Sequence, residues 1–339
     1  MAHGGFERSI PEQACHNPFT GLDISIGVRS VAIWAAARSE HGPGAGNICT
    51  TIRCPMSDIN ERLLAAVEKM PAFPQSVSKV LKLAGDINCS QKDLVEVIKR
   101  DPVFTLKILR LVNSAYFGLS REISSINHAS VYLGLNTLKN VALGLAAVGV
   151  IPKSVSNRLD MGAFWLHSLA TATCTRMLGL KLGVSRDDAA EYFAAGLLHD
   201  IGKVVFALYM PDEFEQATSR ALEPGTSLYK CEREIFGVTH ADIGAMLAEK
   251  WNLPVDLHDA VAFHHSPVET ASQVLDCLFA ANQITKRLAF GSAGNFEVEP
   301  LLERIRDRFG MDMDELIEDL PSLDEEVENA RIFIKLGEA

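Results

Sequence analysis

The sequence predicts an all-α fold for the chain from residue 56 onward. Apolar residues recur at helical spacing in one segment after another, first at Ile59, Leu63 and Val67. Signals that begin a helix precede several of these segments, and Asp101-Pro102 is a clear example, with an acidic cap before a proline at the first helical position. No segment shows the sustained alternation of a half-buried strand. We therefore expect a multi-helix bundle.

The bulk composition narrows the class of protein. The chain is 339 residues long, so one large domain or two small ones are expected. Its hydrophobic content of 47% and charged content of 22% are typical of a globular protein with a sizeable core. The net charge is −11, and residues 297–339 carry most of it, with 14 acidic and 5 basic side chains. This balance argues against a protein that binds nucleic acid through a basic surface.

Neither a membrane anchor nor a disulfide framework is expected. The longest apolar run, residues 141–152, is shorter than the roughly 20 residues that span a bilayer. The N-terminus lacks the basic and apolar regions of a secretory signal. Cys174, Cys231 and Cys277 fall in apolar helical patterns, where a buried free thiol is expected. We therefore expect a cytoplasmic protein with reduced cysteines.

Residues 1–55 differ from the remainder, because they mix Gly, Pro, Ser and His without a sustained period. We expect this segment to be a disordered leader or to arise from an upstream start codon. Consecutive helices are predicted after it. Ser90, with Asp93 three residues later, is a variant of the capping box. The expected helices cover residues 58–69, 76–84, 126–133, 135–148 and 162–180, and two more start after Ser90 and Asp101.

The residues between the first helices can be explained by structural roles, without any catalytic chemistry. Pro71 and Pro74 hold an extended approach to a helix, Asn113 can satisfy backbone groups where a helix ends, and Gly134 permits a tight corner. A partner-binding surface is the functional alternative. In their order, the features of residues 70–138 resemble the N-terminal half of the HDOD family: Pro-x-x-Pro, Asp-Pro, Asn-Ser-Ala and Leu-Gly.

Histidines gather in the second half of the chain, between residues 167 and 265. The pair His199-Asp200 ends a long apolar helix, and a His and a carboxylate together suit a divalent first-row metal. Adjacent ligands on a helix point about 100° apart, so a metal here needs ligands from neighbouring elements. Each histidine also has a structural explanation, as a core residue, a helix cap or a complement to a helix dipole. The candidates are His167, His240, His264 and His265.

The string from Gly196 to Lys203, GLLHDIGK, resembles the signature of HD-superfamily phosphohydrolases, including the HD-GYP branch that cleaves cyclic di-GMP. The resemblance covers most of residues 70–290. It implies an HD-like helical half at residues 156–295, after an N-terminal helical half of the HDOD domain at 56–155. It implies one metal on His167, His199, Asp200 and a downstream Asp, and the added ligands of a binuclear site in His240, His264 and His265.

Two departures from that pattern weaken the implied site. The downstream Asp is expected near residue 280, where the sequence offers Asn282. An amide oxygen can coordinate a metal but brings no negative charge. The Gly-Tyr-Pro loop that marks the cyclic di-GMP enzymes does not follow His264-His265. This second departure argues against cyclic di-GMP as a substrate.

The C-terminal part, residues 296–339, is expected to add acidic helices that pack onto the bundle. One amphipathic helix is predicted over residues 323–336, and its acidic start complements the helix dipole. The alternative is a surface for a basic partner. Other helices are predicted before it, over residues 271–290, 300–308 and 313–320.

We expect a regulatory signalling protein rather than an enzyme. The HDOD proteins that this chain resembles serve as output or scaffold domains in bacterial signal transduction. The sequence leaves no room for a second signalling domain, so we expect a stand-alone protein that acts through partners. The signalling partner and the oligomeric state stay open, and neither nucleic acid nor a membrane is expected among the partners. The site would hold one or two divalent ions, such as iron or manganese, or none.

The alternative is an active metal-dependent phosphohydrolase that acts on a nucleotide or phosphodiester. In that case a metal-bound water would attack the phosphoryl group. Asp200 would orient that water or bridge two metals, and Lys203 would neutralise the developing charge. Asp at position 282 would favour the enzyme, whereas Asn282 favours the regulatory protein. A third hypothesis is a ligand sensor that keeps the old active-site cleft without cleaving anything.

Overall fold

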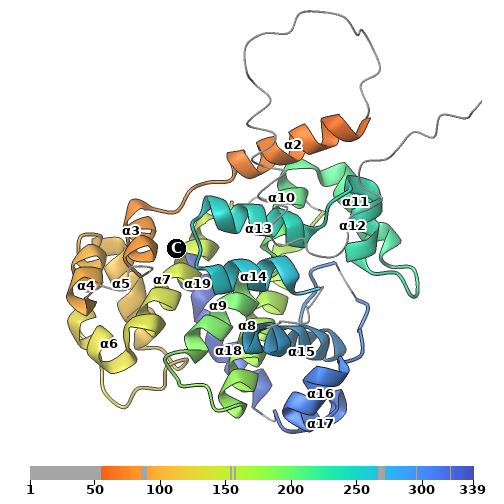
Figure 1. The fold of residues 1–339 in the computed structure, drawn as a ribbon. Helices are drawn as coiled ribbons and strands as arrows, with labels where there is room; N and C mark the ends of the chain where they lie inside the picture. The colour runs from red at the N-terminus through yellow and green to blue at the C-terminus, as the bar shows by residue number, and fades with distance from the viewer. Residues whose placement is uncertain are drawn as a thin grey trace, which may run out of the picture. The chain divides into compact units, whose positions relative to one another are not determined.

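The structure, a computed structural model, describes residues 55–84, 90–152, 155, 158–265, 272–294, 296–320 and 322–339. The chain divides into two units, Met1–Asn47 and Ile48–Ala339. The predicted leader at residues 1–55 lies outside the described residues, apart from Pro55, which begins helix α2. The described residues of the second unit form helices and no strand, so the all-α prediction is confirmed (Figure 1).

The first helices of the unit begin and end where their local sequence signals lie. The Ser90 hydroxyl accepts from the Asp93 amide, and the Asp101 carboxylate accepts from the Phe104 amide, so both predicted caps form. These caps satisfy backbone donors that a helix start leaves free. The helices are α2 (Pro55–Lys69), α3 (Gln75–Ala84), α4 (Gln91–Lys99), α5 (Pro102–Val112), α6 (Ile126–Leu133) and α7 (Leu135–Val150).

A glycine makes the sharp corner between α6 and α7. Gly134 has a φ of 86°, in the left-handed region that favours glycine, and the two helices are bent by 118° there. A Cβ at this position would also lie 2.6 Å from the Asp187 carboxylate, which accepts from the Thr137 amide at 2.7 Å. Asp187 belongs to the connection between α8 (Met161–Lys181) and α9 (Ala189–Leu198). The predicted corner is therefore fixed to the second half of the fold.

Helix α7 is buried along most of its length, from Thr137 to Val148. It is largely apolar on all sides, which is the composition of a helix inside a core. No single helix among the described residues is long and apolar enough to cross a membrane. The bent pair of α6 and α7 reaches that length and composition only when both helices are taken together.

Helices α8 and α9 lie at the centre of the unit, and α15 (Gln273–Arg287) packs against both (Figure 1). Small residues allow the close approach of α8 and α9, since a Cβ at Gly196 would lie only 2.4 Å from the Ala172 Cα. Both helices reach deep into the core, so any polar side chain on their inner faces needs a partner there. The helices around them are α10 (Ile201–Tyr209), α11 (Pro211–Arg220), α12 (Leu228–Phe236), α13 (His240–Lys250) and α14 (Val255–Phe263).

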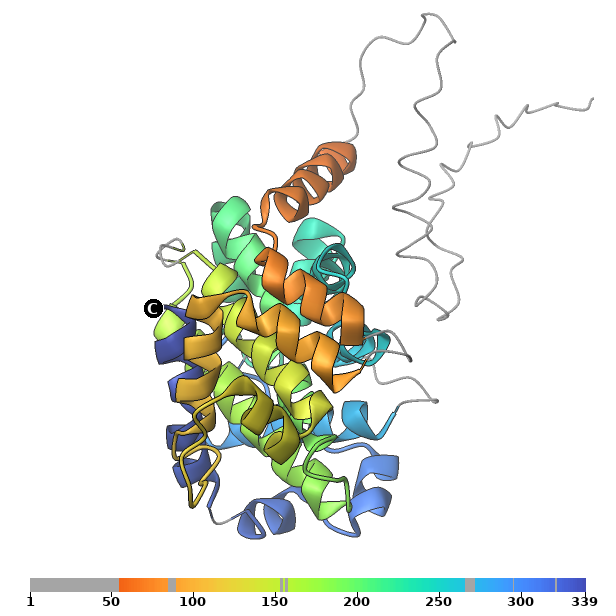
Figure 2. The same cartoon turned by 90° about the vertical axis from the view of Figure 1, so that its left-hand side faces the viewer.

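The C-terminal helices return to the bundle. Helix α18 packs on α8, and α19 packs on α7 and α5, beside which it lies in Figure 2. The prediction of one helix over residues 323–336 is wrong, because the chain breaks at Arg331. The break buries the Phe333 ring against Gly144 of α7, so a tertiary contact outweighs the helical period. The helices are α16 (Glu303–Phe309), α17 (Met313–Glu318), α18 (Leu323–Ala330) and α19 (Ile332–Gly337).

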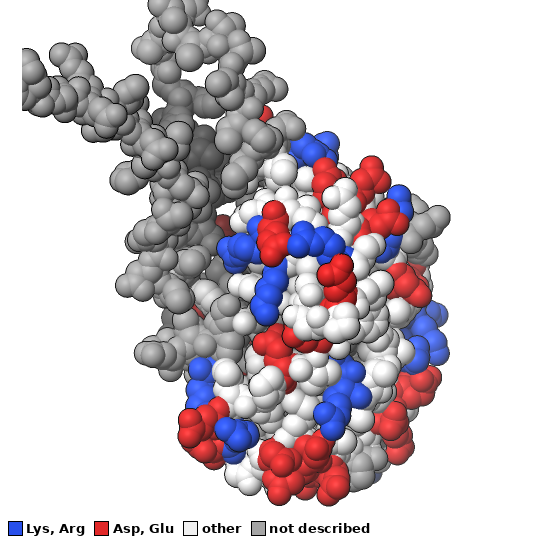
Figure 3. All heavy atoms as spheres, turned by 90° about the vertical axis from the view of Figure 1, so that its right-hand side faces the viewer, with Lys and Arg blue, Asp and Glu red and all other residues white. Residues whose placement is uncertain are grey.

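Basic and acidic side chains are interspersed on the face shown in Figure 3. Some of the exposed charges in the described residues form ion pairs, such as Arg287 with Asp314 at 3.1 Å and Arg220 with Glu234. Exposed pairs of this kind contribute little to stability, typically below about 1 kcal/mol. The face in Figure 3 therefore lacks an extended basic patch, in keeping with the negative net charge.

Gly202 is the point at which α10 touches α13, and it gives a test of this packing. A Cβ there would lie 2.0 Å from the His240 carbonyl oxygen and 2.8 Å from the Gly244 amide nitrogen. Because backbone atoms cannot move aside cheaply, we expect Gly202→Ala to lower the free energy of unfolding by about 3 kcal/mol, measured by urea denaturation. Gly162→Ala is the control, since its nearest contact is the Asp160 carboxylate at 3.3 Å. Equal stability of the two variants would contradict this packing.

Candidate metal centre

The His-Asp pair lies where the chain turns from α9 into α10. His199 follows the last residue of α9, and Asp200, with φ −96° and ψ 8°, precedes the first residue of α10. Both side chains are buried, with 0% and 1% of their surfaces exposed. Ionisable groups in a core need partners, because burial without them is costly.

Different helices deliver the other histidines to Asp200. His167 comes from the middle of α8, and His240 is the first residue of α13. His264 and His265 follow the end of α14. The close approach of α10 and α13 at Gly202 brings His240 to the pair. The structure thus places all five histidines singled out in the sequence around one carboxylate, in two groups that share Asp200.

The first group surrounds the Oδ1 atom of Asp200. The Nε2 atoms of His240 and His264 lie 3.2 and 3.5 Å from this oxygen. The His240 Nε2 atom lies 3.2 Å from that of His264 and 3.0 Å from that of His265. Three imidazoles and one carboxylate oxygen therefore converge on a common point.

The second group faces the Oδ2 atom of Asp200. The Nε2 atoms of His199 and His167 lie 3.3 and 3.7 Å from it. The same oxygen accepts a hydrogen bond from the Lys203 ammonium at 2.7 Å. Lys203 is itself only 2% exposed, so it is paired with the carboxylate inside the core rather than presented to solvent.

In three of these imidazoles the Nδ1 atom, on the side of the ring away from Asp200, already has a hydrogen-bond partner. The Nδ1 atom of His199 lies 2.8 Å from the Gly196 carbonyl, and that of His264 lies 2.8 Å from the Val261 carbonyl. The Nδ1 atom of His240 lies 2.6 Å from a Glu232 carboxylate oxygen. A carbonyl or carboxylate partner requires a proton on Nδ1, which leaves a lone pair on Nε2. The lone pairs of His199, His240 and His264 therefore face Asp200.

Burial favours the neutral form of most of these rings. It lowers the pKa of His167 and of His264 to about 3, and it holds the pKa of His265 well below its usual range. His240 differs, because Glu232 outweighs the effect of burial and raises its pKa. Burial alone would raise the pKa of Asp200, but His199 and Lys203 hold it well below its usual range. The neutral rings of His167, His264 and His265 beside an ionised carboxylate are in the protonation states that metal binding requires.

Several buried polar atoms in this region have no hydrogen-bond partner among the described residues. They include Nε2 of His199, Oδ1 of Asp200 and Oδ1 of Asn282. Asn282 lies on α15 and is 1% exposed, so it belongs to the core, and its role as a ligand stays a prediction. Unpaired buried acceptors are costly in a native protein. A cation beside Oδ1 of Asp200 would satisfy that oxygen, so the buried His/Asp cluster could bind a metal ion.

Two charged residues near the cluster escaped the sequence analysis. The Glu232 carboxylate lies 2.6 Å from the Nδ1 atom of the His240 ring, and it also accepts a hydrogen bond from the His240 backbone amide at 2.8 Å. Its signal was its spacing, since Leu228, Glu232 and Phe236 lie on one buried helical face. The second is Lys286 on α15, whose ammonium is buried without a hydrogen-bond partner. Lys286 lies in the last turn of its helix, where lysines commonly complement the helix dipole, so the sequence did not indicate that its ammonium is buried.

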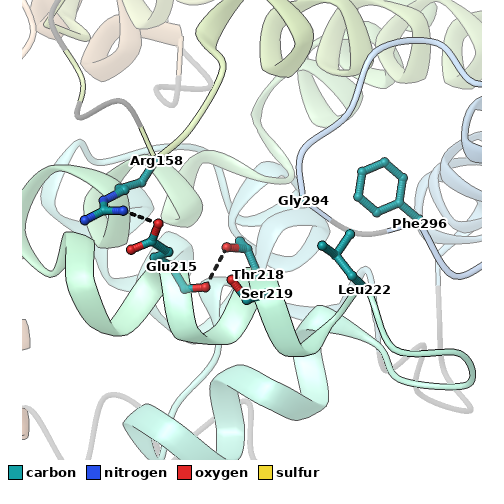
Figure 4. Close-up of a pocket in the computed structure, with 7 residues that line it drawn as sticks. All are labelled: Arg158, Glu215, Thr218, Ser219, Leu222, Gly294 and Phe296. Atoms are coloured by element: carbon teal, nitrogen blue, oxygen red, sulfur yellow. Dashed lines mark hydrogen bonds and ion pairs between the residues drawn. The ribbon is translucent and has the colours of Figure 1, made fainter.

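A surface pocket of about 580 Å³ lies elsewhere and is lined by none of the cluster residues (Figure 4). Its polar groups are largely paired with one another. Arg158 forms an ion pair with Glu215, and the Thr218 hydroxyl donates to the Glu215 carbonyl at 3.1 Å. The pocket therefore does not continue the chemistry of the cluster.

The fold and the cluster define an all-helical protein with a buried His/Asp centre that could hold metal. The HDOD domain family model matches residues 70–267, and the chain belongs to this family. An HDOD domain protein of unknown function from Geobacter sulfurreducens has a similar structure, with a TM-score of 0.65 and 25% identity. The match covers 81% of this chain and 98% of that one.

Two further relatives extend the comparison. A "putative phosphohydrolase" from Shewanella amazonensis has a TM-score of 0.62 and 25% identity, over 80% of this chain and 98% of that one. An uncharacterised protein from Treponema pallidum is 28% identical over 202 residues, or 59% of this chain and 38% of that one. The chain therefore spans less than two thirds of the length of this curated relative.

The buried ammonium of Lys286 predicts a pH dependence of stability. Burial lowers its pKa from 10.5 to about 8. Between these values the unfolded chain binds more protons than the folded chain at this group, so stability rises with pH across this window. We expect Lys286→Met to raise the free energy of unfolding at pH 7, on the order of 2 kcal/mol, and to remove that rise.

The comparison is made by urea denaturation at a series of pH values. Lys335→Met, at an exposed lysine of α19, is the matched control and should follow the parent protein. A Lys286→Met variant that keeps the parent's pH dependence would show that the ammonium is not destabilised by its surroundings.

Proposed function

We propose that the chain is a regulatory signalling protein whose histidine cluster holds one divalent metal ion as a fixed structural element and does not hydrolyse phosphoesters. The observation that carries the proposal is the set of four protein donors formed by Oδ1 of Asp200 and the Nε2 atoms of His240, His264 and His265. The regulatory part follows the output and scaffold role implied by the resemblance to HDOD proteins.

The spacing of these donors supports a closed site. A tetrahedral metal with bonds of about 2.0–2.1 Å has donors about 3.3–3.4 Å apart. The distances from the His240 Nε2 atom are 3.2 Å to Asp200, 3.2 Å to His264 and 3.0 Å to His265. Structural sites use four protein ligands, whereas catalytic sites keep one position for water or substrate. A metal on these four donors would cross-link α10, α13 and the end of α14.

The second position is poorly suited to a metal. The Lys203 ammonium already occupies Oδ2 of Asp200 at 2.7 Å, and a cation there would compete with it. Asn282 supplies a neutral oxygen where the resemblance implies a carboxylate. Asp200 alone would then have to offset the charge of two dications, which favours a single ion.

Limited access to the cluster argues against hydrolysis. His167, His199, Asp200, His240 and His264 are each at most 3% exposed. Of the four proposed ligands only His265 is partly exposed, so a phosphoester would have to displace buried side chains to reach the others. The Lys203 ammonium is paired with Asp200, so it is not free to contact a phosphate. If the chain is instead an active phosphohydrolase, the metal would supply an activated water.

Metal content tests the proposal. We expect purified protein to carry about one equivalent of zinc or iron per chain, measured by elemental analysis, because imidazole donors suit both metals. Asp200→Asn and His240→Gln should each lose the metal, and a chelator should lower the unfolding temperature of the parent protein. His128→Gln, at an exposed histidine outside the cluster, is the matched control. Metal-free protein with unchanged stability in chelator would contradict the structural role.

Position 282 separates the two functions. The parent protein should show no turnover of a generic phosphodiester with added manganese. Asn282→Asp should raise the bound metal toward two equivalents, because it restores the negative charge that a second dication needs. Turnover by the parent protein that Asp200→Asn abolishes would overturn the proposed function in favour of the hydrolase.

A further inference from the structure

A second cavity, distinct from the metal centre, is lined by residues of both halves of the HDOD domain. It has a volume of about 690 Å³, in the range of small-molecule sites. The loop after α5, helices α6 and α7 of the first half, and helices α8 and α9 of the second half contribute to its lining, together with α18 and α19. None of the cluster histidines and carboxylates lines it.

A buried amide without partners lies at this cleft. Asn140 of α7 is 3% exposed, and neither its Oδ1 nor its Nδ2 atom has a hydrogen-bond partner among the described residues. An unpaired buried amide is destabilising, because both of its polar groups have lost their hydrogen bonds to water. It offers one donor and one acceptor side by side. A planar ligand edge with the complementary pair would satisfy both atoms.

Aromatic rings and a stacked arginine form a wall of the cleft. Tyr116 packs edge-on against Phe117 and Phe333, at ring distances of 5.0 and 5.2 Å. The Arg176 guanidinium lies over the Tyr116 ring at 5.2 Å, and its buried Nε atom has no hydrogen-bond partner. Surfaces of this kind bind flat, polarisable groups.

The rim adds a cation for an anionic group. Arg186 lines the cleft, is exposed, and takes part in none of the ion pairs between described residues. The other cations of the lining are engaged, since Arg176 pairs with Glu326 and Lys181 pairs with Asp319. An arginine fork matches the geometry of a phosphate, so Arg186 selects for a phosphorylated ligand.

The cleft is held in shape by contacts that join distant parts of the chain. Asn113 ties the loop after α5 by donating to the Ile123 carbonyl at 2.8 Å and accepting from the Ile123 amide at 2.7 Å. Asp187 fixes the start of α7 through the Thr137 amide and hydroxyl, at 2.7 and 2.9 Å. Little ordering would therefore accompany binding, which favours affinity.

We infer that this cleft binds a purine mononucleotide, with the base edge on Asn140, the base against the aromatic wall and the phosphate at Arg186. An Asn side chain pairs with adenine through one donor and one acceptor, which is the pair that Asn140 leaves unmet. The inference goes beyond the proposed function and does not depend on metal at the histidine cluster. It gives residues of the first half, from the loop after α5 to Asn140 of α7, a binding role outside the metal centre.

Calorimetric titration of the purified full-length chain with AMP tests the inference. We expect saturable binding that is weakened at least tenfold by Asn140→Leu and severalfold by Arg186→Gln. Asn140→Leu should fold, because an apolar side chain of similar size removes the unmet amide, and its unfolding temperature should equal or exceed that of the parent protein. Arg306→Gln, at an exposed arginine of α16 outside the cleft, should leave AMP binding unchanged.

Other outcomes would overturn the inference. Absence of saturable AMP or GMP binding would do so, as would AMP affinity that is unaffected by Asn140→Leu. Inorganic phosphate that binds as tightly as AMP would remove the role of the base. AMP binding that is lost on chelation or in a folded Asp200→Asn variant would place the nucleotide at the metal centre. The two hypotheses can fail separately. If the protein lacks the expected metal but AMP binding still depends on Asn140, the proposed function is wrong and the nucleotide site is supported.

Discussion

The buried carboxylate of Asp200 is the constraint on which the rest of the structure depends. A charge that is 1% exposed needs partners from several directions, and the fold supplies them from α8, α10, α13 and the end of α14. Those helices reach Asp200 because glycines at their contacts leave no side chain between the two backbones. Gly196 allows α8 to meet α9, and Gly202 allows α13 to meet α10. The packing of the core and the chemistry of the cluster are thus one arrangement.

The two oxygens of Asp200 have different surroundings, and this difference shapes the function. Oδ1 faces imidazole lone pairs and has no hydrogen bond, whereas Oδ2 is held by the Lys203 ammonium at 2.7 Å. A cation fits the first position without displacing anything. At the second position a cation would have to displace the Lys203 ammonium from the carboxylate. The two oxygens of Asp200 therefore differ in how well they could accept a metal ion.

The first half of the domain uses its polar residues to shape a cleft rather than to do chemistry. Asn113 closes a loop and Gly134 turns a corner, as the sequence predicts. Their effect reaches further than local structure, because Asp187 links that corner to the helices of the second half. Asn140 then lies at the junction with its amide unmet. A ligand there would contact both halves of the domain.

The sequence by itself determined the helical class, the boundaries of several helices and the histidines that gather around Asp200. Caps such as Ser90 and Asp101 act within one turn, so their effect can be predicted locally. The resemblance to HD proteins identified His199-Asp200 and its companions, but the role of Glu232 needed its contact with His240. Only the tertiary structure decided the break at Arg331, the pairing of Lys203 with Asp200 and the cleft at Asn140. Each depends on atoms from helices far apart in the chain, and a periodic pattern carries no information about such contacts.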